Sequence, residues 1–381
     1  MTDVFESRFH SALTSLFENR AIESDDVRQT AVTTLADLML ESARIGERRL
    51  PDHFDELMQA LLPRVSPHVR ADLARRLAHC DLLPAGTARM LAGDEAAIAG
   101  PILRQSPVLD ELDLIDIATG DSDEKARSIA GRTDLTGDLV SALIDRQDAV
   151  IAASLALSGA NAIDDGMAER IARVPSLPRV AARRLIELAD LSDEILAQLF
   201  WAVESDARRR IIDRMARRHS KNVDTGRLGA EDADQLADAL FALAAAGEHR
   251  EIAARLSETL GLPQGIGQQI IADPQGEALA IATRAAGLSP ERITGIVLLA
   301  VPEAGRSFDI LRTLVGLAED LTPGMARHIT DLWGLSEEAG HAAPRYEPAV
   351  AGPAASRQRG ATSAPRRLED VVADITRKTG S

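Results

Sequence analysis

Arginines in the segment 206–221, DARRRIIDRMARRHSK, are the residues whose type and spacing best suit ligand binding. The candidate anion-binding side chains are Arg208, Arg210, Arg214, Arg217, Arg218 and Lys221. On a helix, all of these except Arg208 lie on one side, and Ile211, Ile212 and Met215 lie toward the other. Because guanidinium groups bind carboxylates and phosphates, the segment predicts a cationic surface for an acidic partner or phosphate groups. The alternative is a solvated helix face balanced by Asp206, Asp213 and acidic residues of neighbouring repeats.

The histidines and carboxylates form no local motif. None of the eight histidines has a second histidine at the i, i+4 spacing of a helical metal pair, so we assign no metal ligand. Asp110, Glu111, Asp113 and Asp116 fall on one short predicted helix. Carboxylates are favourable at a helix N-terminus whether or not they do chemistry, and acid/base catalysis needs their environments to differ.

Nucleophilic and nucleotide-binding patterns are also missing from the sequence. Ser106, Ser158 and Cys80 lie in no nucleophile-elbow or comparable signature. The glycines of GLPQGIGQQI (261–270) lack the third glycine and the preceding strand of a dinucleotide motif, and helix ends explain them. The sequence therefore predicts no catalytic residue and no cofactor.

Composition indicates an all-α protein. Of 381 residues, 45% are hydrophobic and only 3% are aromatic, which suits close packing of helices better than a β-sandwich. The formal net charge of -16 disfavours binding of nucleic acid and of anionic lipid. Cys80 is the only cysteine, which excludes an internal disulfide and fits a cytoplasmic location. No signal peptide and no membrane-spanning stretch are expected.

A repeated unit between residues 67 and 205 determines the predicted architecture. Each unit has a helical run, a break ending in an anchor residue, and a second helical run that starts at a capping residue. The anchors are Leu82, Leu109, Leu135, Ile163 and Leu191, separated by 27, 26, 28 and 28 residues. The caps that follow are Asp110, Thr136, Asp164 and Ser192, all good N-cap residues, whereas Pro84 begins the corresponding run of the first unit.

Within the second helices, apolar residues form a single stripe that needs a neighbour to cover it. Examples are Leu139, Leu143 and Ile144, and then Ile195, Leu196 and Leu199. Because short helix pairs are not stable alone, such units favour an α-solenoid with a shared core. The alternative is a non-repetitive helical bundle, which has no reason to reproduce cap and anchor at near-constant spacing.

Three segments carry a resemblance to a known family. They begin with LPRVSPHVRADLARRLAHCDLLPAGTARMLAGDEAAIAGPILRQSPVLDELDLIDIA and continue with LADALFALAAAGEHREIAARLSETLGLP and DPQGEALAIATRAAGLS. Over roughly residues 30–335 the chain resembles an uncharacterised alphaproteobacterial family, domain of unknown function 2336. The resemblance implies HEAT-like helical repeats and supplies no catalytic residues to carry over, while the spacing of the anchors gives these repeats a period of about 27 residues.

The predicted organisation has five parts. Residues 1–66 cap the array, 67–224 form regular repeats, 225–335 form a less regular helical half, 336–367 form a Pro/Ala/Ser-rich linker and 368–381 form an amphipathic tail. A helix over 4–20 is interpreted as an end cap or, alternatively, as a docking helix. The tail is either a docking motif or a frayed end. Its candidate docking residues are Leu368, Val371, Val372 and Ile375.

These observations predict a non-catalytic scaffold or regulatory adaptor that binds a protein partner, without identifying that partner or the oligomeric state. The alternative is a solenoid that binds phosphate or nucleic acid through the basic helix 206–221. A third hypothesis is an enzyme with a site in the solenoid groove, which requires a concave pocket with converging titratable groups.

Overall fold

The computed structural model describes residues 24–46, 50, 53–158, 162–219, 226–301 and 307–341, with the backbone alone for 336–341. Contacts divide the chain into two compact units. Among the described residues, the first unit runs up to Ser176 and the second begins at Leu177. This division falls inside the predicted range 67–224. The linker beyond residue 341, the tail at 368–381 and the helix at 4–20 lie outside the described residues.

Helices account for all the regular structure in the described ranges, and no strand occurs among them, which confirms the predicted all-α class. The helices of the first unit are α2 (Asp25–Arg44), α3 (Phe54–Leu61), η2 (Leu62–Arg64), α4 (Pro67–Leu77), α5 (Ala85–Gly93), α6 (Ala96–Gln105), α7 (Glu111–Ala118), α8 (Asp123–Ala130), α9 (Gly137–Ile144), α10 (Ala149–Ser158) and α11 (Asp165–Ala172). Those of the second unit are α12 (Arg179–Leu188), α13 (Asp193–Leu199), η3 (Phe200–Ala202), α14 (Ser205–Arg218), α15 (Ala230–Ala246), α16 (His249–Leu260), α17 (Gln264–Ala272), α18 (Glu277–Ala286), α19 (Pro290–Ala300), α20 (Phe308–Asp320) and α21 (Pro323–His341). None of the helices described here is long and apolar enough to cross a membrane.

The predicted capping residues begin the short helices. Side chains of Asp110, Thr136 and Asp164 each accept a hydrogen bond from the backbone N–H three residues later, at the start of α7, α9 and α11. Ser192 occupies the N-cap position of α13, and Pro84 that of α5. Each capping hydrogen bond satisfies a helix N–H that otherwise has no partner, which typically stabilises a helix by about 1 kcal/mol.

Burial of the anchor residues follows the prediction in part. Leu109, Leu135 and Leu191 are buried, whereas Leu82 and Ile163 are only half-buried. In the first repeat the neighbouring Leu83 occupies the core instead. The apolar stripes predicted in α9 and α13 are buried along their whole length.

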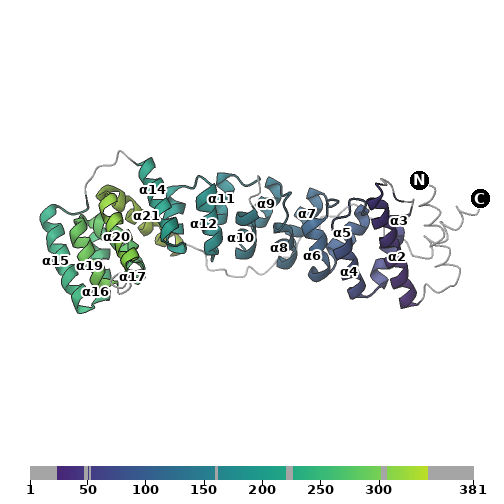
Figure 1. The fold of residues 1–381 in the computed structure, drawn as a ribbon, viewed down its shortest axis with the longest axis horizontal. Helices are drawn as coiled ribbons and strands as arrows, with labels where there is room; N and C mark the ends of the chain where they lie inside the picture. The colour runs from purple at the N-terminus through teal and green to yellow at the C-terminus, as the bar shows by residue number, and fades with distance from the viewer. Residues whose placement is uncertain are drawn as a thin grey trace, which may run out of the picture. The chain divides into compact units, whose positions relative to one another are not determined.

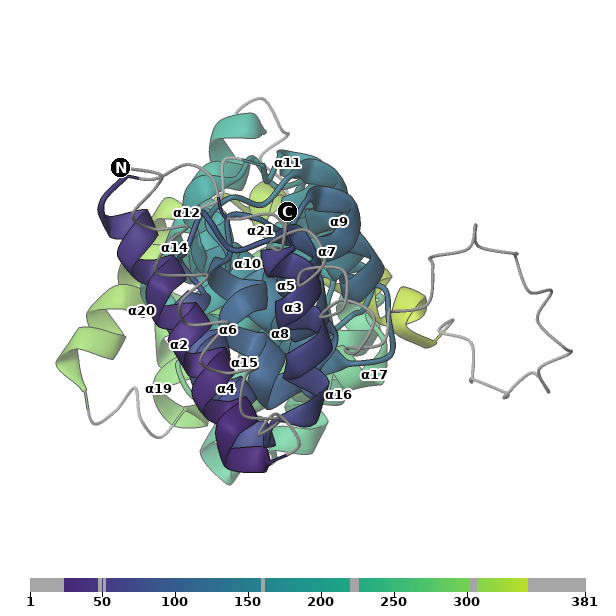
Figure 2. The ribbon, with the colours of Figure 1, turned by 90° about the vertical axis from the view of Figure 1, so that its right-hand side faces the viewer.

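In the first unit the helices form two rows (Figure 1). One row contains α2, α4, α6, α8 and α10, each in contact with the next, and the other contains α3, α5, α7, α9 and α11. Figure 2 looks along these rows from the end at which α2 and α3 lie beside each other. Consecutive helices such as α5 and α6, or α7 and α8, join the rows.

Arginines connect neighbouring helices of a row through a recurring contact, which we call the arginine clamp: a guanidinium that donates to two backbone carbonyls at the end of the helix two elements earlier. Arg132, after α8, donates to the carbonyls of Leu103 and Ser106 at 3.0 Å each, beside the end of α6. Arg146, after α9, donates to Ala118 at 2.8 Å and to Gly120 at 2.6 Å, beside the end of α7.

The described residues of the second unit contain one arginine clamp, and the helices that follow it pack in a different arrangement. In α14, Arg214 donates to the carbonyls of Ile186 and Ala189 at the end of α12. Residues 226–341 instead surround one central helix, α18, which is buried along almost its whole length and contacts α16, α17, α19, α20 and α21. Short breaks at 261–263, 273–276 and 287–289 separate α16, α17, α18 and α19.

Candidate functional site

A basic pocket between α12 and α14 contains four of the arginines singled out in the sequence. Its volume is about 440 Å³, and its lining consists of Ile186, Glu187, Arg210, Asp213, Arg214, Arg217 and Arg218. α14 presents these arginines because its other face is apolar and buried, through Ala207, Ile211, Ile212 and Met215. The predicted helix and the predicted common side of these arginines are therefore correct.

Each arginine of the pocket has a different set of contacts. Arg210 forms an ion pair with Glu187 at 2.8 Å, and Arg214 is held by its two carbonyls. Arg218 pairs with Asp190 and Asp193 and also donates to the carbonyl of Leu191.

Arg217 is the exception in the pocket: it is exposed, and no ion pair with another described residue involves it. The lining holds four guanidinium groups and two carboxylates, so it carries a formal charge of about +2 in a chain of net charge -16. This pocket is consequently a positively charged site that can accept an anion.

Arg208 does not belong to this surface. Its side chain is buried and points to the other side of α14, where it contacts Asp273 and Glu277 at 2.9 Å each. Its guanidinium also lies 4.6 Å from the centre of the Phe200 ring. Burial raises the pKa of the Glu277 carboxyl, although Arg208 opposes that effect. Lys221 and the tail residues Leu368, Val371, Val372 and Ile375 lie outside the described residues.

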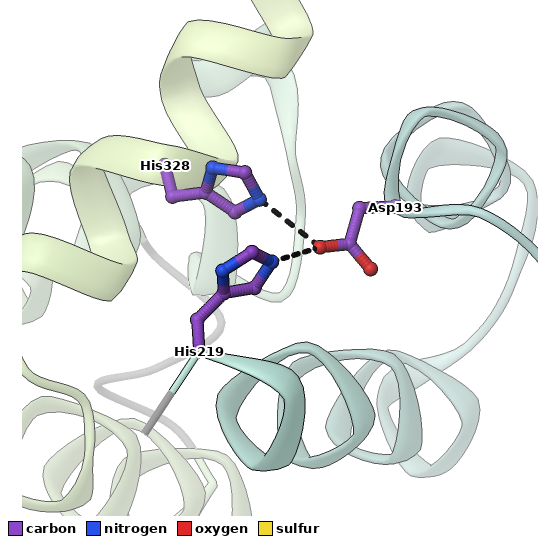
Figure 3. Close-up of side chains that lie close together, drawn as sticks. All are labelled: Asp193, His219 and His328. Carbon is purple, nitrogen blue, oxygen red and sulfur yellow. Dashed lines mark hydrogen bonds and ion pairs between the residues drawn. The ribbon is translucent and has the colours of Figure 1, made fainter. Parts of the chain in front are cut away.

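A second cluster combines two histidines with a carboxylate (Figure 3). Asp193 is the first residue of α13, His219 follows the end of α14, and His328 lies within α21. Nε2 of His219 lies 2.6 Å from Oδ2 of Asp193, and Nε2 of His328 lies 3.1 Å from the same oxygen. The imidazole centres are 4.4 Å apart. Both rings thus converge on one carboxylate oxygen from separate helices, all within the second unit.

Arg218 holds the Asp193 carboxylate from its other side, with Nη1 2.8 Å from Oδ1. Burial alone would raise the pKa of Asp193, but the hydrogen bonds from Arg218, His328 and His219 outweigh burial and hold this pKa below its usual value. The carboxylate is therefore ionised at neutral pH. Its side chain is 11% exposed, and those of His219 and His328 are 32% and 28% exposed, so small solutes can reach the imidazoles.

Sequence reasoning missed this cluster because its members are 26 and 135 residues from Asp193 along the chain. A search for metal ligands on one helix detects only pairs a turn apart, and no such pair exists here. The only local signal was that His219 directly follows the arginine run.

Other residues considered in the sequence have structural contacts. Asp110 and Asp113 bind Arg89, and Asp110 also caps α7. Cys80 and Ser106 are buried, and burial raises the pKa of the Cys80 thiol. Ser158 donates to the carbonyl of Leu155. These residues contribute to helix ends and to the core.

Comparison with curated proteins found no match, and comparison with solved structures found none. A protein-family model matches residues 98–331, more than half of the chain, and this range includes the basic pocket as well as Asp193, His219 and His328. The family named from the resemblance is thereby confirmed over residues 98–331. The chain belongs to the family described as an uncharacterised protein conserved in bacteria (DUF2336).

Proposed function

We propose that this chain is a non-catalytic helical-repeat adaptor of the cytoplasm, built as a HEAT-like α-solenoid, which binds an acidic segment of a protein partner in the basic pocket. The observation that carries the proposal is the convergence of Arg210, Arg214, Arg217 and Arg218 on one depression of about 440 Å³. Guanidinium groups in a concave site bind carboxylates with directional hydrogen bonds as well as charge.

The repeat architecture is supported by two independent spacings. Anchor residues recur every 26 to 28 residues in the sequence, and the arginine clamps join residues separated by 25 to 29 positions. Similar spacing of core and polar contacts is expected when each helix pair stacks on an equivalent pair. Stacked pairs leave helix faces exposed for docking, which is the usual role of such arrays.

A protein partner suits the pocket better than a nucleic acid does. Glu187 and Asp213 lie within the lining, and a run of phosphates would meet both carboxylates as well as the acidic surface of the chain. A short acidic peptide places its carboxylates between the arginines without extending far beyond them. Arg217 contributes most to this contact, because binding does not require it to leave an ion pair with another described residue.

The test uses the full purified chain and a fluorescently labelled oligoglutamate peptide, with binding followed by anisotropy. We expect saturable binding that weakens steeply with salt, at least about tenfold weaker binding for Arg217→Gln, and a smaller loss for Arg210→Gln. Arg312→Gln, which removes an exposed charge from α20 in the same unit, is the control and should bind as the native chain does.

Two outcomes oppose the proposal. Absence of peptide binding at low salt, or an equal loss in Arg312→Gln, shows that the pocket does not recognise acidic peptides. Single-stranded DNA serves as the comparison probe: if DNA binds more tightly than the peptide and loses affinity in the same two variants, the pocket binds phosphates instead.

A further inference from the structure

The strongest feature outside the lining of the basic pocket is the meeting of two imidazoles and one carboxylate (Figure 3). The three potential ligand atoms, Oδ2 of Asp193 and Nε2 of His219 and of His328, all lie within 4.8 Å of one another. Two neutral imidazoles with a carboxylate form a ligand set that suits first-row transition metals, whereas Ca²⁺ and Mg²⁺ favour sets made of oxygen.

We infer that Asp193, His219 and His328 bind a divalent transition metal ion, of which Zn²⁺ is the representative, and that the ion fixes α21 to α13 and α14. The ligand atoms approach one another from three separate elements of the second unit, so a single ion bonded to all three joins these elements. This inference does not depend on the proposed adaptor function.

The geometry requires only small movements. Zn²⁺ bonds nitrogen and oxygen at about 2.0–2.2 Å, which places neighbouring tetrahedral ligand atoms about 3.3–3.5 Å apart. The present separations of 2.6 and 3.1 Å correspond to hydrogen bonds from the two imidazoles to one oxygen. Each of these two N–O separations has to lengthen by less than about 1 Å to reach the tetrahedral value, and a fourth position is left for water.

The proton balance is simple. As hydrogen-bond donors to Asp193, both imidazoles carry a proton on Nε2, and a metal needs the lone pair of that atom. Each ring that is neutral moves its proton to Nδ1 through exchange with solvent, so no net proton is released. A ring that is protonated before binding releases one proton.

The surrounding charges favour a dication. Arg218 orients Asp193 through Oδ1 and leaves Oδ2 for the metal, as outer-shell donors commonly do. Arg218 is paired with Asp190 as well as with Asp193, so these three side chains together carry a formal charge of about -1. Half-buried imidazoles also reduce competition from water without closing the entry path.

The experiment titrates the full chain, freed of metal with a chelator, with Zn²⁺ in a calorimeter, and measures the metal retained after dialysis. We expect one Zn²⁺ per chain and a higher melting temperature with Zn²⁺ but not with Mg²⁺. His219→Gln and His328→Gln should each bind at least about tenfold more weakly. His249→Gln, at the start of α16 in the same unit, is the control and should bind as the native chain does.

Co²⁺ supplies a second readout that does not depend on stability. Bound Co²⁺ with nitrogen ligands gives visible absorption bands, which we expect in the native chain and in His249→Gln but not in His328→Gln. Circular dichroism checks that each variant is folded. Absence of stoichiometric Zn²⁺ binding, or equal binding by the native chain and both cluster variants, overturns the inference and leaves a purely hydrogen-bonded cluster.

Discussion

In the second unit, one buried arginine forms ion pairs with two buried carboxylates. Arg208 contacts Asp273 and Glu277, and all three side chains are almost inaccessible to solvent. Asp273 also accepts a hydrogen bond from the N–H of Ala278 in α18. Removing the guanidinium leaves two carboxyl groups in the core without their counter-charge, which is costly even when one of them takes up a proton.

We therefore predict that Arg208→Met lowers the free energy of unfolding by about 3–5 kcal/mol. Urea unfolding followed by tryptophan fluorescence measures this loss, because both tryptophans of the chain, Trp201 and Trp333, lie in the second unit. Arg209→Met is the matched control, since the neighbouring side chain is exposed and pairs with exposed carboxylates. Its loss should stay below about 1 kcal/mol, and equal losses would refute the prediction.

Sequence reasoning at this scale identified the arginines but not their partners. The helical period correctly separated Arg210, Arg214, Arg217 and Arg218 from the apolar face of α14. It could not show that Arg208 is buried, because its carboxylate partners are 65 and 69 residues further along the chain. The histidine cluster escaped detection for the same reason: contacts between distant segments leave no local pattern.

At the scale of secondary-structure elements, many of the recognisable sequence patterns mark the ends of helices. The segment RAAGL (284–288), which contributes to the family resemblance, is a helix end: Gly287 ends α18 with a φ of +109°, which favours glycine. Gly226 packs so closely against Gly287 that a Cβ added to Gly226 would lie 2.4 Å from the Gly287 Cα. This segment therefore serves helix packing, which explains why it points to fold and not to activity.

The arginine clamps lead to a prediction about the free energy of unfolding of the first unit. Arg132 is 3% exposed and satisfies two carbonyls at the end of α6, so Arg132→Met should lower the free energy of unfolding of the first unit by about 2–3 kcal/mol. Arg127→Met, which removes a more exposed ion pair with Asp148 from the neighbouring helix α8, should cost less than about 1 kcal/mol. Urea unfolding followed by circular dichroism compares the two variants.

For the whole molecule, the sequence predicted the all-α class and the starts of α5, α7, α9, α11 and α13, whereas the division after Ser176 could not be read from it. The pattern of break, anchor and cap continues unchanged from α11 to α13, because it reflects the local needs of each helix pair. The position of the boundary between the two units depends instead on which helix pairs contact one another. Local patterns are therefore a good guide to elements and a poor guide to units.

We predict that the two units unfold in separate transitions. Tryptophan fluorescence reports only the second unit, whereas circular dichroism reports helices of both, so the two signals should give different midpoints in urea. Arg132→Met should shift the circular dichroism transition and leave the fluorescence midpoint in place. Coincident native curves, together with an equal shift of both signals in this variant, would establish a single cooperative transition.

The choice of arginine for the clamps has a consequence for alkaline conditions. A guanidinium keeps its proton well above the pH at which a lysine amine becomes neutral, and it is not a substrate for lysine acetylation. Of the 43 basic residues in the sequence, only Lys125, Lys221 and Lys378 carry amines. The arginine clamps between neighbouring helices of a row are thus insensitive to moderate alkalinity and to modification by acyl donors.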